Sequence, residues 1–239
     1  MKKTIALLLA LVMSLSLVGV TGVSAAEVYD GTSVSASLAG AGTEADPYLI
    51  NNIDDLVLFR DSVNAGETKY NAAGVYVALG DDIDMSGIDW SVNIGDDCNA
   101  TFDGIFDGKN HTISNLTATE TAQKGDGFIC SGLFGAIYGS AQIKNLTIEN
   151  ATINTGNYKG SNVGVVVGFA YNETATIENV KVIGDIKIDA TMVNGVGTIV
   201  GYAYYGDPTI KNCEVIANEG SYIKAKSEAG GIVGYGGAV

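Results

Sequence analysis

Eight aspartates crowd into one stretch of the sequence and are the first residues with a clear chemical potential. They are Asp81, Asp82, Asp84, Asp89, Asp96, Asp97, Asp103 and Asp107. Paired carboxylates hydrolyse glycosidic bonds in many enzymes, and clustered carboxylate oxygens bind Ca²⁺. The stretch lacks the ligand spacing of an EF-hand and any nonapeptide calcium repeat. We therefore favour aspartates that end strands and line turns, predict no cofactor, and keep Ca²⁺ as the one metal alternative.

The other reactive side chains are too sparse for a recognisable catalytic site. Arg60 is the only arginine, whereas a polysaccharide lyase or hydrolase would gather acids with Arg or Lys on one face. His111 is the only histidine, and no nucleophile-elbow sequence accompanies it. Lysines fall at outward or loop positions without clustered acids; they are Lys159, Lys181, Lys187, Lys211 and Lys224. We predict no catalytic, cofactor-binding or metal-binding residue and no enzymatic activity, with a carbohydrate-active enzyme as the alternative.

Cysteines and tyrosines allow further interpretations. Cys213 takes a position that Leu and Val occupy in sister repeats, which predicts a small buried hydrophobe. Cys98 and Cys130 are available for a disulfide after export, but the distance between them does not follow from sequence. Six tyrosines follow repeated glycines: Tyr138, Tyr171, Tyr202, Tyr204, Tyr205 and Tyr235. An aromatic stripe suits binding of a sugar or protein and equally suits packing at corners, so no binding residue is named.

The N-terminus predicts export. Lys2 and Lys3 precede an apolar run over residues 5–20, and small residues at 24–26 form a cleavage-like site, so residues 1–26 are a predicted signal peptide. A membrane span is the competing interpretation, but a span needs about 20 apolar residues. The mature protein is therefore predicted to be secreted, extracellular or at the cell surface, without insertion into the membrane.

Charge and composition narrow the partners and the fold. Loss of the two signal lysines takes the formal net charge from −14 to −16, which argues against nucleic acid and anionic lipid as partners. A chain with 32 Gly and only 2 Pro, rich in Val, Ile, Thr and Tyr, suits short strands joined by tight turns.

A repeat of 33 residues organises most of the chain. Short apolar motifs end at Gly135, Gly168, Gly201 and Gly234, and the three intervals are 33 residues each. A second marker is centred on Asn115, Asn145, Asn179 and Asn212, at intervals of 30, 34 and 33. Two markers with one period indicate a repeat architecture.

The alternation of side chains around each asparagine predicts how the repeat folds. In TIENVKV, Ile177 and Asn179 share one face, and after Asn179 the inward phase flips to Val180 and Val182. Side chains alternate with period two along a strand, so each asparagine is predicted to lie at a corner and face inward. Its amide is predicted to bond to backbone or to the asparagine of the next coil. GDIKIDA and VGTIVGYAYYG supply two more short strands. The fold class is predicted to be all-β, a right-handed parallel β-helix, with a β-sandwich as the alternative.

The N-terminal part of the mature chain is predicted to start the solenoid. Residues 27–42 form a flexible leader, and residues 43–110 form the N-terminal cap and first coils. Within them, Tyr48–Ile50 is a buried strand, and the apolar spacing over Asp54–Asn64 predicts a short capping helix. Residues 111–239 form the repeats of the β-helix.

Several motifs together resemble a known family. They are GTEADPYLINNIDDLVLFRDSVNAG, YVALGDDIDMSG, FDGIFDGKNHTISNLT and GLFG. From Gly42 to Val239 the chain resembles bacterial surface proteins that carry the GLUG motif. This resemblance implies an adhesin-like or IgA-peptidase-associated β-helical region, and it indicates architecture rather than activity. Later repeats depart from GLFG, with GVVVG ending at Gly168 and GTIVG ending at Gly201.

These observations favour a non-catalytic module that acts in adhesion or ligand binding, or as a scaffold for a larger surface protein. The expected partner is a host or environmental protein or glycan. A carbohydrate-active β-helix enzyme and a passive stalk for a C-terminal effector domain are the alternatives. Because the sequence stops directly after a repeat marker at Gly234, we expect the polypeptide to continue into further repeats or domains.

Overall fold

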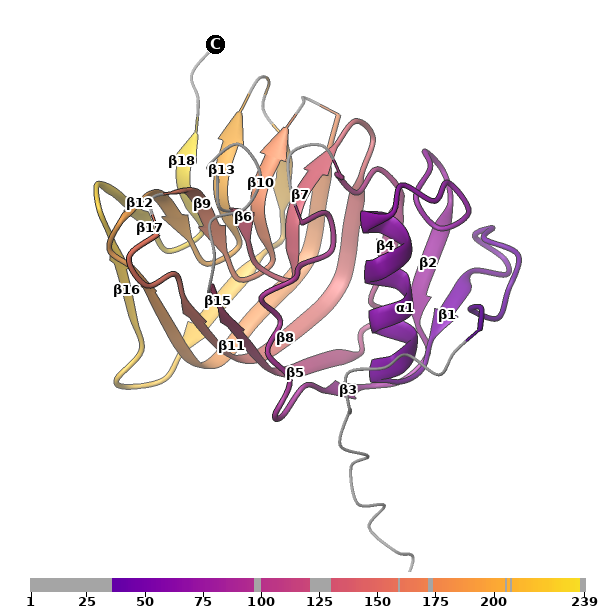
Figure 1. The fold of residues 1–239 in the computed structure, drawn as a ribbon, viewed down its shortest axis with the longest axis horizontal. Coiled ribbons are helices and arrows are strands. Elements are labelled where there is room, and N and C mark those ends of the chain that lie inside the picture. Colours follow the sequence, from indigo (N-terminus) through magenta and orange to yellow (C-terminus); the bar gives the residue numbers. More distant parts are fainter. Residues whose placement is uncertain are drawn as a thin grey trace, which may run out of the picture.

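The chain folds into a stack of parallel β-strand coils with a helix at one end (Figure 1). A computed structural model describes residues 36–96, 100–120, 130–158, 160–171, 174–204, 206 and 208–236. It confirms the predicted parallel β-solenoid, with about five turns and little helix. The predicted signal peptide and most of the predicted leader lie outside the described residues.

Three sheets run along the stack. Sheet A contains β1 (Tyr48–Ile50), β2 (Tyr76–Leu79), β3 (Ile83–Asp84), β4 (Ile105–Asp107), β5 (Thr112–Thr119), β8 (Gln142–Asn154), β11 (Thr176–Ala190), β14 (Thr209–Lys211), β15 (Glu214–Ala217) and β16 (Tyr222–Ala225). Sheet B contains β7 (Phe134–Tyr138), β10 (Val167–Tyr171), β13 (Val200–Tyr204) and β18 (Val233–Gly236). Sheet C contains β6 (Cys130–Ser131), β9 (Gly160–Gly164), β12 (Val193–Gly197) and β17 (Glu228–Gly230).

The strand register confirms the 33-residue period. Thr176 of β11 pairs with Thr209 of β14, and Val200 of β13 pairs with Val233 of β18. One coil runs along β11, then β12, then β13, before the chain enters β14. The strands divide differently from the prediction, because GDIKIDA is part of the long, bent β11 and VGTIVGYAYYG is split into β12 and β13.

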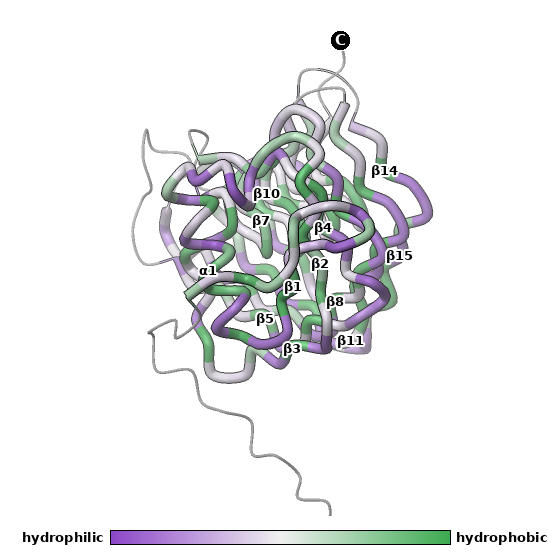
Figure 2. The backbone as a smooth tube through the Cα atoms, turned by 90° about the vertical axis from the view of Figure 1, so that its right-hand side faces the viewer, coloured by the Kyte–Doolittle hydropathy of each residue, from purple (hydrophilic) through white to green (hydrophobic). Residues whose placement is uncertain are grey.

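Inward-facing aliphatic side chains form the core, and equivalent residues of successive coils lie in register. Ile143 pairs with Ile177, and Ile148 with Val182, and all four are fully buried. Figure 2 colours the backbone by residue hydropathy and shows hydrophobic residues, in green, in the strands of sheet A. Complete burial of one such side chain stabilises the fold by roughly 1.5–3 kcal/mol.

The N-terminal end of this core is covered by α1 (Ile53–Asn64), as predicted. The Asn52 side chain accepts a hydrogen bond of 3.0 Å from the backbone N–H of Asp55 and caps the helix. Phe59 is fully buried and packs edge-on against Phe102, with ring centroids 5.7 Å apart. No helix in the described ranges is long and apolar enough to cross a membrane.

The packed structure begins earlier than the predicted end of the leader at Gly42. Leu38 is buried, and its backbone N–H donates a hydrogen bond of 3.0 Å to the Tyr70 hydroxyl. Ala39 forms an antiparallel bridge with Leu49. Leu38 is therefore an apolar residue within a Gly/Ser/Ala/Thr stretch that packs this segment against the first coil.

Asparagines occupy the predicted corners. Asn145, Asn179 and Asn212 have left-handed φ values of 52°, 55° and 52°, which asparagine tolerates better than other side chains. The Asn212 amide donates to Asn179 Oδ1 at 3.2 Å, Asn179 donates to Asn145 at 3.1 Å, and Asn145 donates to Asp107 at 3.0 Å. The predicted inward orientation is wrong, because Asn179 and Asn212 are exposed. A left-handed residue breaks the period-two alternation, so Asn179 does not share a face with Ile177.

Asn115 belongs to a second corner, contrary to the prediction that placed it with the other three asparagines. Ser114 pairs with Glu149, which sets Asn115 beside Asn150. The Asn150 amide donates to Asn115 Oδ1 at 3.3 Å, and the Asn115 amide donates to Asp84 Oδ1 at 2.8 Å. Both asparagines have left-handed φ, at 60° and 58°. Asn115 and Asn145 both begin an Asn-Leu-Thr sequence, although they lie at different corners of sheet A.

Asp84 accepts the hydrogen bond from Asn115 at this second corner, and its ionisation makes the free energy of unfolding depend on pH. Hydrogen bonds from the Asn115 amide and the Ser86 hydroxyl hold the pKa of the Asp84 carboxyl below its ordinary value of 3.8. A lowered folded-state pKa adds stability that is complete above the unfolded pKa and is lost as the pH falls through the folded one.

We therefore expect the free energy of unfolding to fall as the pH drops from about 5 to about 3, and expect Asp84→Asn to flatten this slope. Urea titrations of both proteins across that pH range provide the measurement. Identical slopes would contradict the role of Asp84.

Candidate aromatic binding surface

The described aspartates of the acidic stretch serve as turn and corner acceptors, as favoured from the sequence. Asp82 accepts the backbone N–H of Thr112 at 2.8 Å, and this hydrogen bond, followed by that of His111, lowers the pKa of its carboxyl. Asp103 accepts the N–H of Ser140 at 2.7 Å. Among the described residues, no three His, Cys, Asp or Glu side chains come close enough to hold a metal ion. Asp97 lies outside the described residues.

The remaining candidate residues are dispersed over the fold. His111 Nδ1 lies 3.1 Å from Asp82 in a turn, and the Arg60 guanidinium lies over the Trp90 ring, 4.8 Å from its centroid. Cys213 occupies the predicted inward position but is half-buried rather than fully buried, and this burial raises the pKa of its thiol. Cys98, which the sequence offers as a disulfide partner for Cys130, lies outside the described residues.

Outward lysines of the last coils do have acidic neighbours, contrary to the prediction. Carboxylates on adjacent coils face three of them: Lys181–Glu214 at 3.2 Å, Lys211–Glu178 at 2.8 Å and Lys224–Asp189 at 2.6 Å. The period brings these residues into register, which linear sequence does not reveal. Such exposed pairs contribute about 0–1 kcal/mol each and form no reaction centre.

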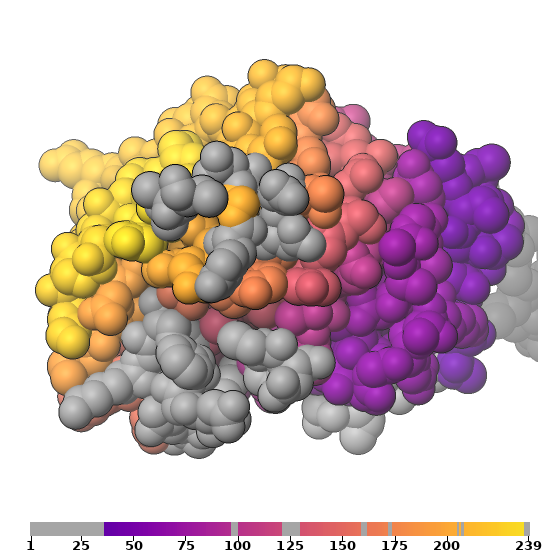
Figure 3. Space-filling view, turned by 90° about the horizontal axis from the view of Figure 1, so that it is seen from above, coloured from indigo at the N-terminus to yellow at the C-terminus, as the bar shows by residue number. Residues whose placement is uncertain are grey.

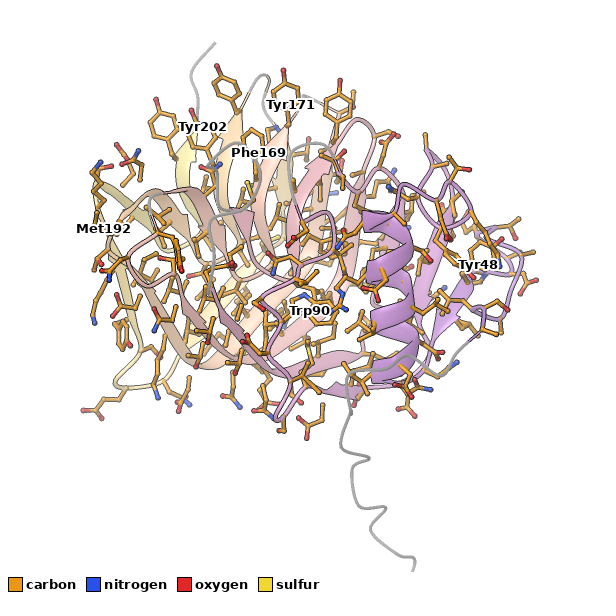
Figure 4. All side chains as sticks on the ribbon, in the orientation of Figure 1. Tyr48, Trp90, Phe169, Tyr171, Met192 and Tyr202 are labelled. Carbon is orange, nitrogen blue, oxygen red and sulfur yellow. The ribbon has the colours of Figure 1, made fainter. Side chains whose placement is uncertain are left out.

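Aromatic side chains gather on the outer face of sheet B (Figure 4). We define the aromatic surface as Tyr138, Phe169, Tyr171, Tyr202, Tyr204 and Tyr235. The strand sequences explain this placement, because alternation in Gly-Phe-Ala-Tyr and Gly-Tyr-Ala-Tyr turns Ala170 and Ala203 inward and the rings outward.

The rings form two rows that run across the coils. The outer row contains Tyr138, Tyr171 and Tyr204, with centroids separated by 5.3 and 6.1 Å. Phe169, Tyr202 and Tyr235 form the inner row, with separations of 5.8 and 4.7 Å. Tyr138 and Tyr235, one in each row, are the most exposed, at 44% and 38%. Parallel pairing therefore places the outer row on β7, β10 and β13 and the inner row on β10, β13 and β18.

Sheet C supports the inner row and influences its electrostatics. A Cβ at Gly195 of β12 would lie 3.2 Å from Tyr202 Cδ2, so the tyrosine ring rests against this backbone. Burial, followed by the neighbouring Tyr235 and Glu228, raises the pKa of the Tyr202 hydroxyl. The ring therefore stays neutral and can donate a hydrogen bond.

Sequence reasoning identified most of the aromatic surface but missed one ring. Phe169 breaks the tyrosine pattern by residue type, although its position relative to Gly168 matches that of Tyr202 relative to Gly201. Tyr205, which was included in the stripe, lies outside the described residues. Strands β7, β10, β13 and β18 carry no carboxylate, imidazole, thiol or ammonium group, so the polar groups of their side chains are the phenol hydroxyls.

Comparisons with known proteins give a sequence relative and a structural neighbour. No family model matches the chain. It is 32% identical over 148 residues to Halomucin of Haloquadratum walsbyi, which covers 62% of this chain but only 2% of Halomucin. The crystal structure of a candidate immunoglobulin A1 protease from Bacteroides ovatus aligns with a TM-score of 0.50 and 22% identity, covering 83% of this chain and 64% of that one. This likeness concerns the fold alone.

Proposed function

We propose that this protein is an exported, non-catalytic β-solenoid module that binds a ligand through the aromatic surface. The observation that carries the proposal is the set of six half-buried or exposed rings in register on sheet B. Exposed groups of apolar side chains commonly mark binding sites, and tyrosine combines an apolar body with a polar tip. The rigid strands hold the rings in place before any ligand arrives.

Export and a role at the cell surface are part of the same proposal. The charged start, apolar run and small-residue site of residues 1–26 support secretion. The similarity to Halomucin and the GLUG-type motifs support a role in adhesion or as a scaffold within a larger protein. Because each coil contacts only its neighbours, a solenoid can display a surface on a stack of any length.

Binding arrays test this proposal. We expect the purified protein to bind a defined subset of glycans or matrix proteins, and Tyr171→Ala to lower the bound signal about tenfold, equivalent to about 1.4 kcal/mol. Tyr222→Ala is the matched control, because Tyr222 is 40% exposed but lies on β16 of sheet A. Thermal unfolding of both variants checks that they are folded.

The alternatives give different results in the same experiment. A passive stalk would bind nothing on the arrays, and equal loss of binding in the Tyr222→Ala control would exclude the aromatic surface as the site. Release of sugar products from a polysaccharide panel would instead support a carbohydrate-active enzyme.

A further inference from the structure

We infer that the ligand of the aromatic surface is a neutral, extended polysaccharide that lies across the coils, parallel to the solenoid axis. This inference rests on the proposed function and specifies the class of its ligand. It follows from three features of the surface: its periodicity, its lack of charge and the orientation of its rings.

Periodicity favours a polymer. The outer row repeats one tyrosine per coil, at Tyr138, Tyr171 and Tyr204, and the inner row repeats one ring per coil from β10 to β18, shifted by one coil. Neighbouring strands are about 4.8 Å apart, a spacing of the same order as the length of one pyranose residue in an extended β-linked chain. Successive sugars can therefore meet equivalent rings on successive coils.

The absence of charge favours a neutral polymer. Strands β7, β10, β13 and β18 contain no Asp, Glu, Lys or Arg, although the protein carries a formal net charge of −14. Glu228 lies close enough to Tyr202 to help raise the pKa of the tyrosine hydroxyl, so this neighbouring ionised group is negative. An anionic polysaccharide would meet repulsion and find no cation on these strands.

The stacking of the rings favours hydroxyl-rich ligands over cations. Cations bind over ring faces, but Tyr138 stacks on Tyr171 at an interplanar angle of 19°, and Tyr202 stacks on Tyr235 at 20°. The stacked faces cover each other, leaving the electropositive ring edges and the phenol hydroxyls for a ligand. Sugar hydroxyls can donate to and accept from the phenol hydroxyls, and their oxygens can contact the electropositive ring edges. Figure 3 shows successive parts of the chain, coloured from pink to yellow, side by side along the molecule.

Calorimetry with cello-, xylo- and chito-oligosaccharides of two to six residues tests the inference. We expect affinity in at least one series to rise with length and to level off near about four residues, because four coils supply rings and strands lie about 4.8 Å apart. Tyr171→Ala should weaken binding of the hexasaccharide about tenfold, whereas Tyr222→Ala should leave it unchanged. Tyr171→Phe, which keeps the ring, should give a smaller loss.

Three results would overturn this inference. They are tighter binding of polygalacturonate than of neutral oligosaccharides, affinity independent of length, and an absence of binding in all three neutral series. If the arrays show a protein or anionic ligand whose binding is lost in Tyr171→Ala, the proposed function survives and the assignment of a neutral polysaccharide is wrong. If no ligand on the arrays depends on Tyr171, the proposed function fails as well.

Discussion

Replacing Gly201 by alanine is expected to lower the free energy of unfolding by about 3 kcal/mol or more. A Cβ at this position would lie 2.5 Å from the backbone nitrogen of Val163 and 2.6 Å from the carbonyl oxygen of Gly168. Both neighbours are backbone atoms held in sheets, so neither can move aside without breaking strand pairing. Guanidinium unfolding monitored by circular dichroism measures the loss.

Gly231→Ala is the matched control for this substitution. Gly231 lies in the connection between sheets C and B one coil later, and a Cβ there would meet no atom within 4 Å. We expect it to change stability by no more than about 0.5 kcal/mol, as at ordinary surface sites. Equal stability of the Gly201→Ala protein and wild type would contradict the close approach of sheets B and C.

This close approach explains the glycine repeat in physical terms. Glycines stand at both ends of the short arc between sheets C and B, and a Cβ at each would meet backbone atoms closer than 3 Å. They are Gly132, Gly135, Gly164, Gly168, Gly197, Gly201, Gly230 and Gly234. The arc spans three residue steps between β6 and β7, the first strands of sheets C and B, and four in the later coils. GLFG and GTIVG are therefore a shorter and a longer form of the same connection.

Replacing Asn179 by leucine is expected to cost about 2–5 kcal/mol. Leucine at a left-handed φ of 55° costs roughly 1–2 kcal/mol, and loss of the hydrogen bonds to Asn145 and Asn212 removes roughly 0.5–1.5 kcal/mol for each bond. Asn179→Gly isolates the second contribution, because glycine adopts this φ without strain. Urea titration compares the variants.

Lys181→Ala provides the control for the corner. Lys181 is outward-facing and paired at 3.2 Å with Glu214 on the exposed surface, so its removal should cost no more than about 0.5 kcal/mol. If this change destabilises the protein as much as Asn179→Leu, the assignment of Asn179 as a corner residue is wrong.

The sequence was sufficient to predict the architecture because the fold repeats. The coil length of 33 residues follows from the spacing of Gly168, Gly201 and Gly234, and the repeated asparagines give nearly the same spacing. No knowledge of contacts is needed for this step. The capping helix was visible because apolar residues change there from a period of two to a helical period. Even so, α1 begins at Ile53 rather than Asp54, because Asn52 is its N-cap.

Details that depend on neighbouring coils were not accessible from the sequence. The outward position of Asn179 follows from one left-handed residue, which a period-two pattern cannot represent. The misplacement of Asn115 arose because two corners of a coil share similar sequences. Only the strand register shows that Phe169 lies beside Tyr202 and belongs to the aromatic surface.

The most direct test of the ligand surface is ¹⁹F NMR of protein labelled with 3-fluorotyrosine, titrated with cellohexaose or xylohexaose. We expect the resonances of Tyr171, Tyr202 and Tyr204 to shift or broaden as sugar is added. Tyr48 and Tyr70 pack against each other near the N-terminal end, 4.8 Å between centroids, and should not respond. Unchanged resonances on sheet B, or shifts confined to Tyr48 and Tyr70, would contradict the assignment of the aromatic surface as the binding site.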